Sequence, residues 1–100
     1  MFSKTDIINI LTKNKQTITE FGVVKLGLFG SYHRNEQSES SDIDFLVLFE
    51  KEKKTYRNFF NLGLFLETLL NKKVELVTPE SLEQFMKSKI LKDVEDVLFT

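Results

Sequence analysis

The sequence contains no cysteine among its 100 residues, which excludes disulfide bonds and metal sites built on thiolates. It also lacks an excess of positive charge, since its formal net charge is −1 and its pI is about 5.8. A broad electrostatic grip on a nucleic-acid duplex needs a basic face, so we expect no direct DNA binding. A nucleotide remains compatible with this charge, because a metal ion and backbone amides can neutralise its phosphates.

No apolar run approaches the roughly 20 residues that a membrane-spanning helix needs. The first residues, Met1-Phe2-Ser3-Lys4, lead into a polar, periodic segment and not into the apolar core of a signal peptide. We therefore expect a soluble, cytoplasmic protein without membrane contact. A chain of 100 residues predicts one domain, residues 1–100. Its ten phenylalanines give the small core of such a domain a large aromatic content.

Hydrophobic periodicity predicts the element order α–β–(short α)–β–α–β–α. The expected helices span residues 5–13, 16–21, 55–70 and 81–99, the last as one or two short pieces, and the expected strands span 23–29, 42–50 and 73–78. The strand–helix–strand unit over 42–77 is compatible with a crossover, which makes its two strands parallel. The strand order is not determined by the sequence.

The most informative stretch lies between the first two strands. It starts with Gly30-Ser31 and ends with Asp42-Ile43-Asp44. Two carboxylates two residues apart at a strand start point to the same side of a sheet, and a Gly-Ser turn that opens a helix offers free amides to phosphate. Carboxylates beside that turn would repel a phosphate unless a hard cation such as Mg²⁺ lies between them. The stretch therefore predicts a metal–nucleotide site.

The same residues carry a family resemblance. Gly30-Ser31, an arginine three residues after the serine, and Ser41-Asp42-Ile43-Asp44 followed by apolar residues resemble the minimal nucleotidyltransferases of the DNA polymerase β-like superfamily. The similarity is to the MntA-like antitoxin branch, which is paired with HEPN-domain toxins. It covers nearly the whole chain, including the strand around Glu75. It implies an α+β or α/β fold with a polymerase β-like core, in which helices pack on one face of a small mixed β-sheet.

The resemblance also implies an activity and a site. The activity is transfer of AMP from ATP to a hydroxyl, the acceptor being a tyrosine of a cognate HEPN toxin, with two Mg²⁺ ions when nucleotide is bound. The implied catalytic and metal-binding residues are Asp42, Asp44 and Glu75; the implied nucleotide-binding residues are Gly30, Ser31 and Arg34.

Several of these positions have a second interpretation. Ser31 also suits a plain helix N-cap. Arg34 either faces phosphate or pins the turn by pairing with a carboxylate such as Glu36. Glu75 stands where the family usually has aspartate, and it is either a ligand or an exposed residue of an edge strand. Because Glu reaches one methylene further than Asp, and a misplacement of about 1 Å can cost roughly a hundredfold in rate, metal and nucleotide binding are favoured over fast catalysis.

These alternatives leave two function hypotheses. The first is the enzyme described above. The second is an antitoxin with a weak or degenerate site that neutralises its partner by binding alone. A transferase acting on a small antibiotic is disfavoured, since the chain has no second domain to hold such a substrate. The predicted helix over 55–70 is apolar around much of its circumference, which predicts an interface there with a partner protein or a second copy of the chain.

Overall fold

The computed structural model describes residues 2–99, so the two ends of the predicted domain, Met1 and Thr100, lie outside the described residues. The chain begins with helices α1 (Lys4–Lys13) and α2 (Lys15–Glu20). Ser3 is the N-cap of α1 and forms a capping box with Asp6, in which each residue accepts from the backbone N–H of the other. This reciprocal pair explains why the helix begins one residue earlier than the apolar periodicity predicts.

Within residues 2–99 the strands form one mixed sheet of four, in the order β3-β2-β1-β4. The strands are β1 (Val23–Phe29), β2 (Ile43–Phe49), β3 (Val74–Val77) and β4 (Glu95–Phe99). β2 pairs antiparallel with β1 and parallel with β3. The parallel pair confirms the crossover predicted over 42–77, whose helix is α4 (Tyr56–Leu70).

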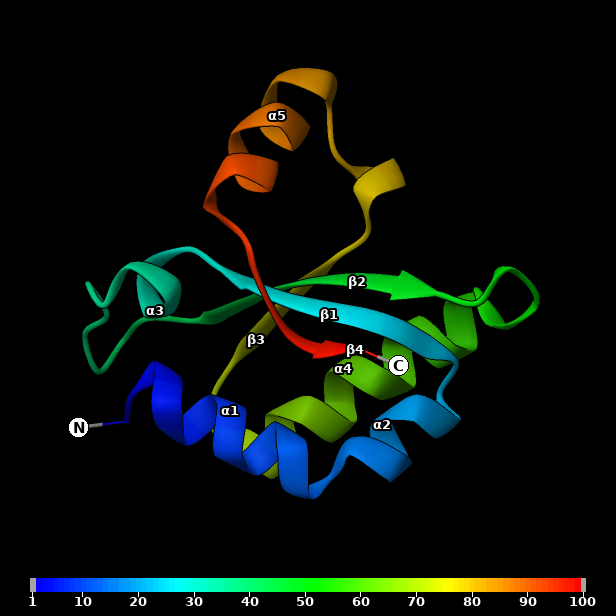
Figure 1. Cartoon of the computed structure of the whole chain (residues 1–100), viewed down its shortest axis with the longest axis horizontal. Helices are drawn as coiled ribbons and strands as arrows, with labels where there is room; N and C mark the ends of the chain where they lie inside the picture. Colours follow the sequence, from blue (N-terminus) through cyan, green and yellow to red (C-terminus); the bar gives the residue numbers. More distant parts are fainter. Residues whose placement is uncertain (1, 100) are drawn as a thin grey trace.

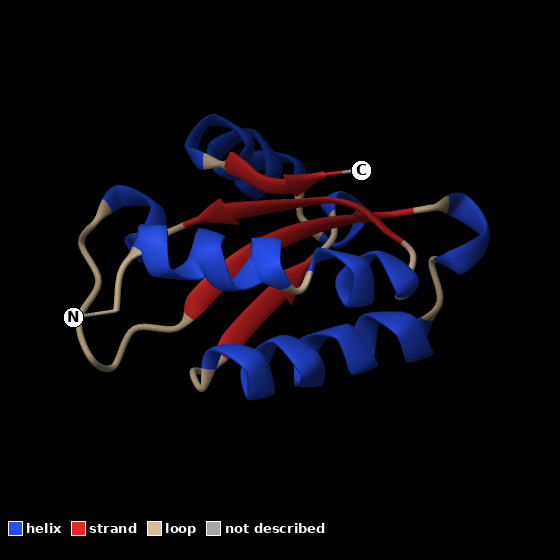
Figure 2. Ribbon diagram, turned by 60° about the horizontal axis from the view of Figure 1, so that its bottom comes forward, coloured by secondary structure: helices blue, strands red, loops and turns tan. Residues whose placement is uncertain are grey.

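Helices α1, α2 and α4 cover one face of the sheet, as Figures 1 and 2 show. Alternate residues of β2 point to that face, and Ile43, Phe45 and Val47 are fully buried there in one cluster with Leu62 and Leu66 of α4. This apolar layer is the core of the molecule. None of the helices among the described residues has the length and apolar character that crossing a bilayer requires.

The opposite face of the sheet carries Asp44 and Leu46, and helix α5 (Gln84–Asp93) lies on that side (Figure 1). Leu46 is buried, and so is Ile90 of α5, although neither belongs to the main cluster. The chain reaches α5 from β3 through a short 3-10 turn, η2 (Pro79–Ser81), with Pro79 at its first position, which tolerates proline well. A similar turn, η1 (Lys51–Lys53), follows β2.

The prediction of helix over 81–99 is wrong beyond Asp93, because residues 95–99 form the edge strand β4, antiparallel to β1. Val97 and Leu98 are consecutive and both buried, a pattern that the irregular register of this pair allows. Gly27 of β1 makes room for the strand, since a Cβ there would lie 2.5 Å from Val94 Cγ2. The glycine inside β1 thus serves a close approach of neighbouring chain.

Candidate active site

The Gly30 turn and Asp44 are in direct contact. Phe29, the last residue of β1, pairs with Asp44 of β2, so the turn that follows lies beside the Asp44 carboxylate. Gly30 has φ 79° and ψ −155°, a backbone conformation that residues with a Cβ atom disfavour. A Cβ at this position would collide with the carboxylate. Glycine is therefore required twice here, by its backbone conformation and by its neighbour.

Asp44 and Glu75 are partners in the parallel pairing of β2 with β3, so their side chains leave the sheet on the same side. The pKa of Asp44 is raised to about 6, first by burial, then by the charges of Glu75 and of Asp42. Arg34 acts in the opposite direction and lowers this pKa. The structure thus brings the three predicted carboxylates within electrostatic reach of one another, centred on Asp44.

The outer two carboxylates are more accessible than Asp44. Asp42 is exposed and directly precedes β2, and Glu75 is exposed on the edge strand β3. No three acidic or histidine side chains among residues 2–99 converge tightly enough to hold a metal ion by themselves. Mg²⁺, however, takes one or two protein carboxylates and completes its shell with waters and substrate phosphates. The adjacent Asp44–Glu75 pair, with Asp42 nearby, therefore fits such an ion.

Ser31 is the first residue of the short helix α3 (Ser31–Arg34), and its predicted N-cap role is wrong, because Gly30 is the N-cap and no side chain caps the helix. Ser31 is half-buried. The helix ends at Asn35, which has φ 60° and ψ 38°, a left-handed conformation that asparagine tolerates better than most residues. Asn35 therefore suits the turn that ends α3.

Arg34 is held by two carboxylates. Its Nε donates to Glu36 Oε1 at 3.0 Å, and its Nη1 donates to Asp93 Oδ2 at 2.5 Å. The predicted pairing with Glu36 is confirmed. The contact with Asp93 was not predicted.

Asp93 is the residue of this site that sequence reasoning missed. It is the last residue of α5, and its Oδ2 also accepts the backbone N–H of Gly30, at 3.2 Å and across 63 residues of sequence. No sequence pattern marks it, because one aspartate in a charged helical tail has no distinguishing neighbours. Asp93 reaches the motif only because α5 lies over the face of the sheet opposite α1, α2 and α4 and ends near the end of β1 (Figure 1).

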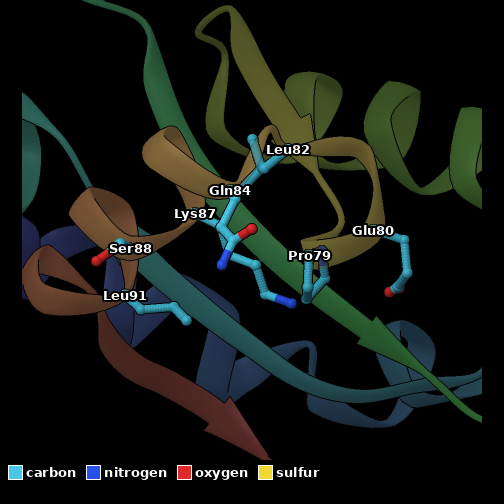
Figure 3. A pocket seen from close by; sticks show the side chains of 7 residues that line it. All are labelled: Pro79, Glu80, Leu82, Gln84, Lys87, Ser88 and Leu91. Atoms are coloured by element: carbon cyan, nitrogen blue, oxygen red, sulfur yellow. The ribbon is translucent and has the colours of Figure 1, made fainter.

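A groove of about 520 Å³ lies between η2 and α5, as Figure 3 shows. The side chains that line it are Pro79, Glu80, Leu82, Gln84, Lys87, Ser88 and Leu91. None of the residues predicted for the site lines it. The carboxylates and the Gly30 turn therefore lie outside this groove.

A small sheet with a Gly-Ser turn against a strand-start Asp-x-Asp pair defines a nucleotidyltransferase. The family model described as nucleotidyltransferase domain matches residues 7–97, so the chain belongs to this family, and it is a nucleotidyltransferase.

Three comparisons sharpen the family assignment. The chain is 41% identical over 95 residues to the protein adenylyltransferase MntA of Thermococcus cleftensis, covering 94% of this chain and 95% of that protein. A solved minimal nucleotidyltransferase superposes with TM-score 0.73 and 29% identity, covering 88% of this chain and 93% of that one. A toxin–antitoxin crystal structure with AMP-PNP shares the fold, with TM-score 0.72 and 23% identity, covering 93% of this chain and 73% of that one. The small mixed sheet with packed helices, predicted from the resemblance, is thereby confirmed. The predicted packing on one face holds for α1, α2 and α4 but not for α5, which lies on the opposite face (Figure 1).

Proposed function

We propose that the chain transfers AMP from ATP to a tyrosine hydroxyl of a cognate HEPN-domain toxin and thereby neutralises it. The observation that carries the proposal is the Asp44 carboxylate, which is packed against the Gly30 turn and paired in register with Glu75. Its raised pKa reflects burial first and then the charges of Glu75 and Asp42, and a bound cation would favour its ionised form. The adenylyltransferase activity named for the 41% identical relative supports AMP as the group transferred.

The chemistry is a displacement at the α-phosphorus of ATP. The tyrosine oxygen forms a bond to that phosphorus, the bond between the α-phosphorus and the bridging oxygen to the β-phosphate breaks, and pyrophosphate leaves with the electron pair. The hydroxyl proton passes to Glu75 or to solvent, because an exposed carboxylate near the reacting centre is the group of this site that can accept it. Ser31 and the Gly30 turn hold the phosphates.

Asp42, Asp44 and Glu75 would hold two Mg²⁺ ions together with the nucleotide. Bound there, the ions supply charge neutralisation for the phosphates and for the attacking and leaving oxygens. The three carboxylates would place the positive charge of the ions next to the Gly30 turn. Arg34 remains on its carboxylate partners Glu36 and Asp93, so it stabilises the turn and sets the local charge around Asp44.

Intact-mass measurement tests this proposal directly. The protein is mixed with Mg²⁺, ATP and the purified toxin of its own operon, and the toxin is expected to gain the mass of one or more AMP groups. Asp44→Asn should abolish the gain, whereas Asp96→Asn, which removes a carboxylate paired with Lys25, should leave it intact. A toxin that keeps its mass but loses its activity on mixing would contradict enzymatic transfer.

That outcome would favour the second candidate function, neutralisation by binding alone. The observation behind it is the exposure of Glu75 on an edge strand, at a position where the family resemblance expects aspartate. In an enzyme, Glu75→Asp should match or exceed the natural transfer rate, whereas an occluding antitoxin should transfer no AMP with either residue at position 75.

The surface proposed to receive the toxin is the outer side of α4. Tyr56, Phe60 and Leu64 lie one helical turn apart and are 81%, 51% and 49% exposed, and the rings of Tyr56 and Phe60 stack with centroids 6.1 Å apart. The C-terminal helix does not cover this surface, because α5 lies on the other side of the sheet (Figures 1 and 2). Exposed apolar side chains grouped in this way are typical of protein interfaces.

Light scattering tests this surface, first on the chain alone and then with the toxin. Tyr56→Ser together with Phe60→Ser is expected to weaken the complex at least tenfold, since buried aromatic anchors contribute most of the energy of many interfaces. Phe85→Ser is the matched control, because Phe85 is equally apolar and 77% exposed but belongs to α5. If the chain alone is a dimer that the double substitution dissociates, the surface is a homodimer interface and not the toxin site.

A further inference from the structure

Asp93 joins the C-terminal segment to the nucleotide motif through two groups of that motif. Its Oδ2 accepts from the Gly30 amide at 3.2 Å and from Arg34 Nη1 at 2.5 Å. The side chain is 26% exposed, against 48% for Arg34. A half-buried carboxylate that accepts from both a backbone amide and a guanidinium is strongly localised, because charge-assisted hydrogen bonds are shorter and stronger than neutral ones.

The position of Asp93 explains why both contacts form at once. α5 ends at Asp93, and β4 then begins at Glu95, which pairs with Leu28 of β1. Gly30 follows two residues after Leu28, at the point where the β1 backbone leaves the sheet. The Asp93 side chain therefore takes the place of one further rung of the β1–β4 ladder and satisfies the amide that the strand no longer pairs.

The two groups that Asp93 holds both act on Asp44. Gly30 packs directly against the Asp44 carboxylate, and the Arg34 charge lowers the pKa of Asp44. Asp93 itself is not among the charges that shift Asp44. The contacts of Asp93 with the site run through the turn and through Arg34.

We propose that Asp93 is a positioning residue for nucleotide binding: by holding the Gly30 amide and the Arg34 guanidinium with one oxygen, it fixes the phosphate-binding turn against Asp44. The inference rests on the proposed nucleotidyl transfer. It adds to that proposal a contribution from the end of α5, a segment distant from the motif in sequence. His33, whose Nε2 lies 3.9 Å from Asp93 Oδ1, faces the other oxygen and leaves these two contacts in place.

The main test compares Asp93→Asn, Arg34→Gln and the double variant, with Asp96→Asn as the control carboxylate of the same segment. Asparagine keeps an oxygen for the Gly30 amide but loses the charge that holds Arg34. Its KM for ATP is expected to rise about tenfold, the usual scale for a lost charge-assisted hydrogen bond, with kcat nearly unchanged. Because Asp93 acts through Arg34, the double variant should be no worse than the poorer single variant.

Hydrogen exchange of the Gly30 amide, measured without nucleotide, gives a second readout that does not depend on activity. Asp93→Ala should speed exchange at Gly30 well beyond the Asp93→Asn variant, while Asp96→Asn leaves it unchanged. Unaltered exchange in Asp93→Ala would overturn the role of Asp93 even if transfer is normal. A wild-type protein that transfers no AMP would overturn the proposed function instead.

Two kinetic results would also overturn the positioning role. Strictly additive effects of Asp93→Asn and Arg34→Gln on KM would show that the two residues act independently. A lower KM for ATP in Asp93→Asn would show that the Asp93 carboxylate competes with the phosphates for the turn and does not support it.

Discussion

The two faces of the sheet differ in the kind of side chain that they carry. The face under α1, α2 and α4 contains fully buried apolar side chains that belong to the main cluster of the core. The face under α5 carries Asp44, whose pKa is raised to about 6 by burial first and then by the charges of Glu75 and Asp42. One face is optimised for folding. The other retains charge repulsion that protonation of Asp44 or a bound cation relieves, which marks it as the functional side.

Truncation of the buried face should have the largest effect on stability. Phe45→Ala removes a fully buried ring of the main cluster and is expected to cost about 3–5 kcal/mol of the free energy of unfolding. Chemical denaturation measures this loss. Leu48→Ala, on the same strand but directed to the other face and only partly buried, should cost less than about 1.5 kcal/mol. Equal losses of unfolding free energy at positions 45 and 48 would show that the two faces do not differ in their contribution to stability.

Removal of charge from the other face should affect binding and spare the fold. Asp42→Asn or Asp44→Asn is expected to weaken Mg²⁺-dependent ATP binding by at least about a hundredfold, because a carboxylate ligand to the ion is lost. Calorimetric titration of Mg-ATP measures this effect, and circular dichroism checks the fold. Affinity close to that of the wild type in either variant would remove that residue from the site.

A smaller and more selective effect is expected at Glu75. Glu75→Gln should slow single-turnover transfer by about tenfold or more while ATP affinity changes little, since general-base assistance commonly contributes a factor of at least this size. Both quantities are measured on the same preparation. Unchanged transfer would show that Glu75 is a bystander on its edge strand.

The smallest effect is the pH dependence of stability without ligand. The folded-state pKa of Asp44 is raised from 3.8 to about 6, so its protonated form favours folding. This contribution is fully present below pH 3.8 and is lost as the pH rises through about 6. With Asp44 partly open to solvent, the loss should be about 1 kcal/mol after allowance for screening.

The variant Asp44→Asn isolates that contribution from those of other titrating groups. Thermal unfolding of the wild type and of the variant is compared at pH 4.5 and pH 7.5. The variant should gain stability relative to the wild type as the pH rises, and saturating Mg-ATP should restore the wild type alone. A constant difference across this range would mean that Asp44 is not destabilised in the folded state.

Much of the buried face was predictable from sequence, because its signals are local. The strand over 23–29 and the helix ending at Leu70 follow from runs and periodicities that neighbouring residues define. β4 was missed because Val94, Val97 and Leu98 have a spacing that a helix would also accept. The strand conformation of Val97 and Leu98 depends on hydrogen bonds to β1, about 70 residues earlier, and no local pattern encodes that pairing.

The residues of the site also divide into those that a local sequence pattern predicts and those that depend on the tertiary fold. Asp42, Asp44 and the Gly30 turn belong to one short motif, and the pairing of Phe29 with Asp44 places them together as the sequence predicts. The contact of Arg34 with Glu36 was predictable because the two residues are neighbours on the chain. Asp93 reaches the same arginine from the end of α5, so its part in the site depends on the tertiary path of the chain and was not visible beforehand.

The contact between Gly30 and Asp44 also limits how this protein can change over generations. A mutation that enlarges position 30 meets the carboxylate at position 44, and a second mutation that shortens position 44 to make room removes the acid itself. Position 30 therefore cannot accept a larger residue, by either order of two single substitutions, while an acid is kept at position 44. Drift can therefore alter the surrounding loop, including Asn35, whereas Gly30 is retained for as long as Asp44 is.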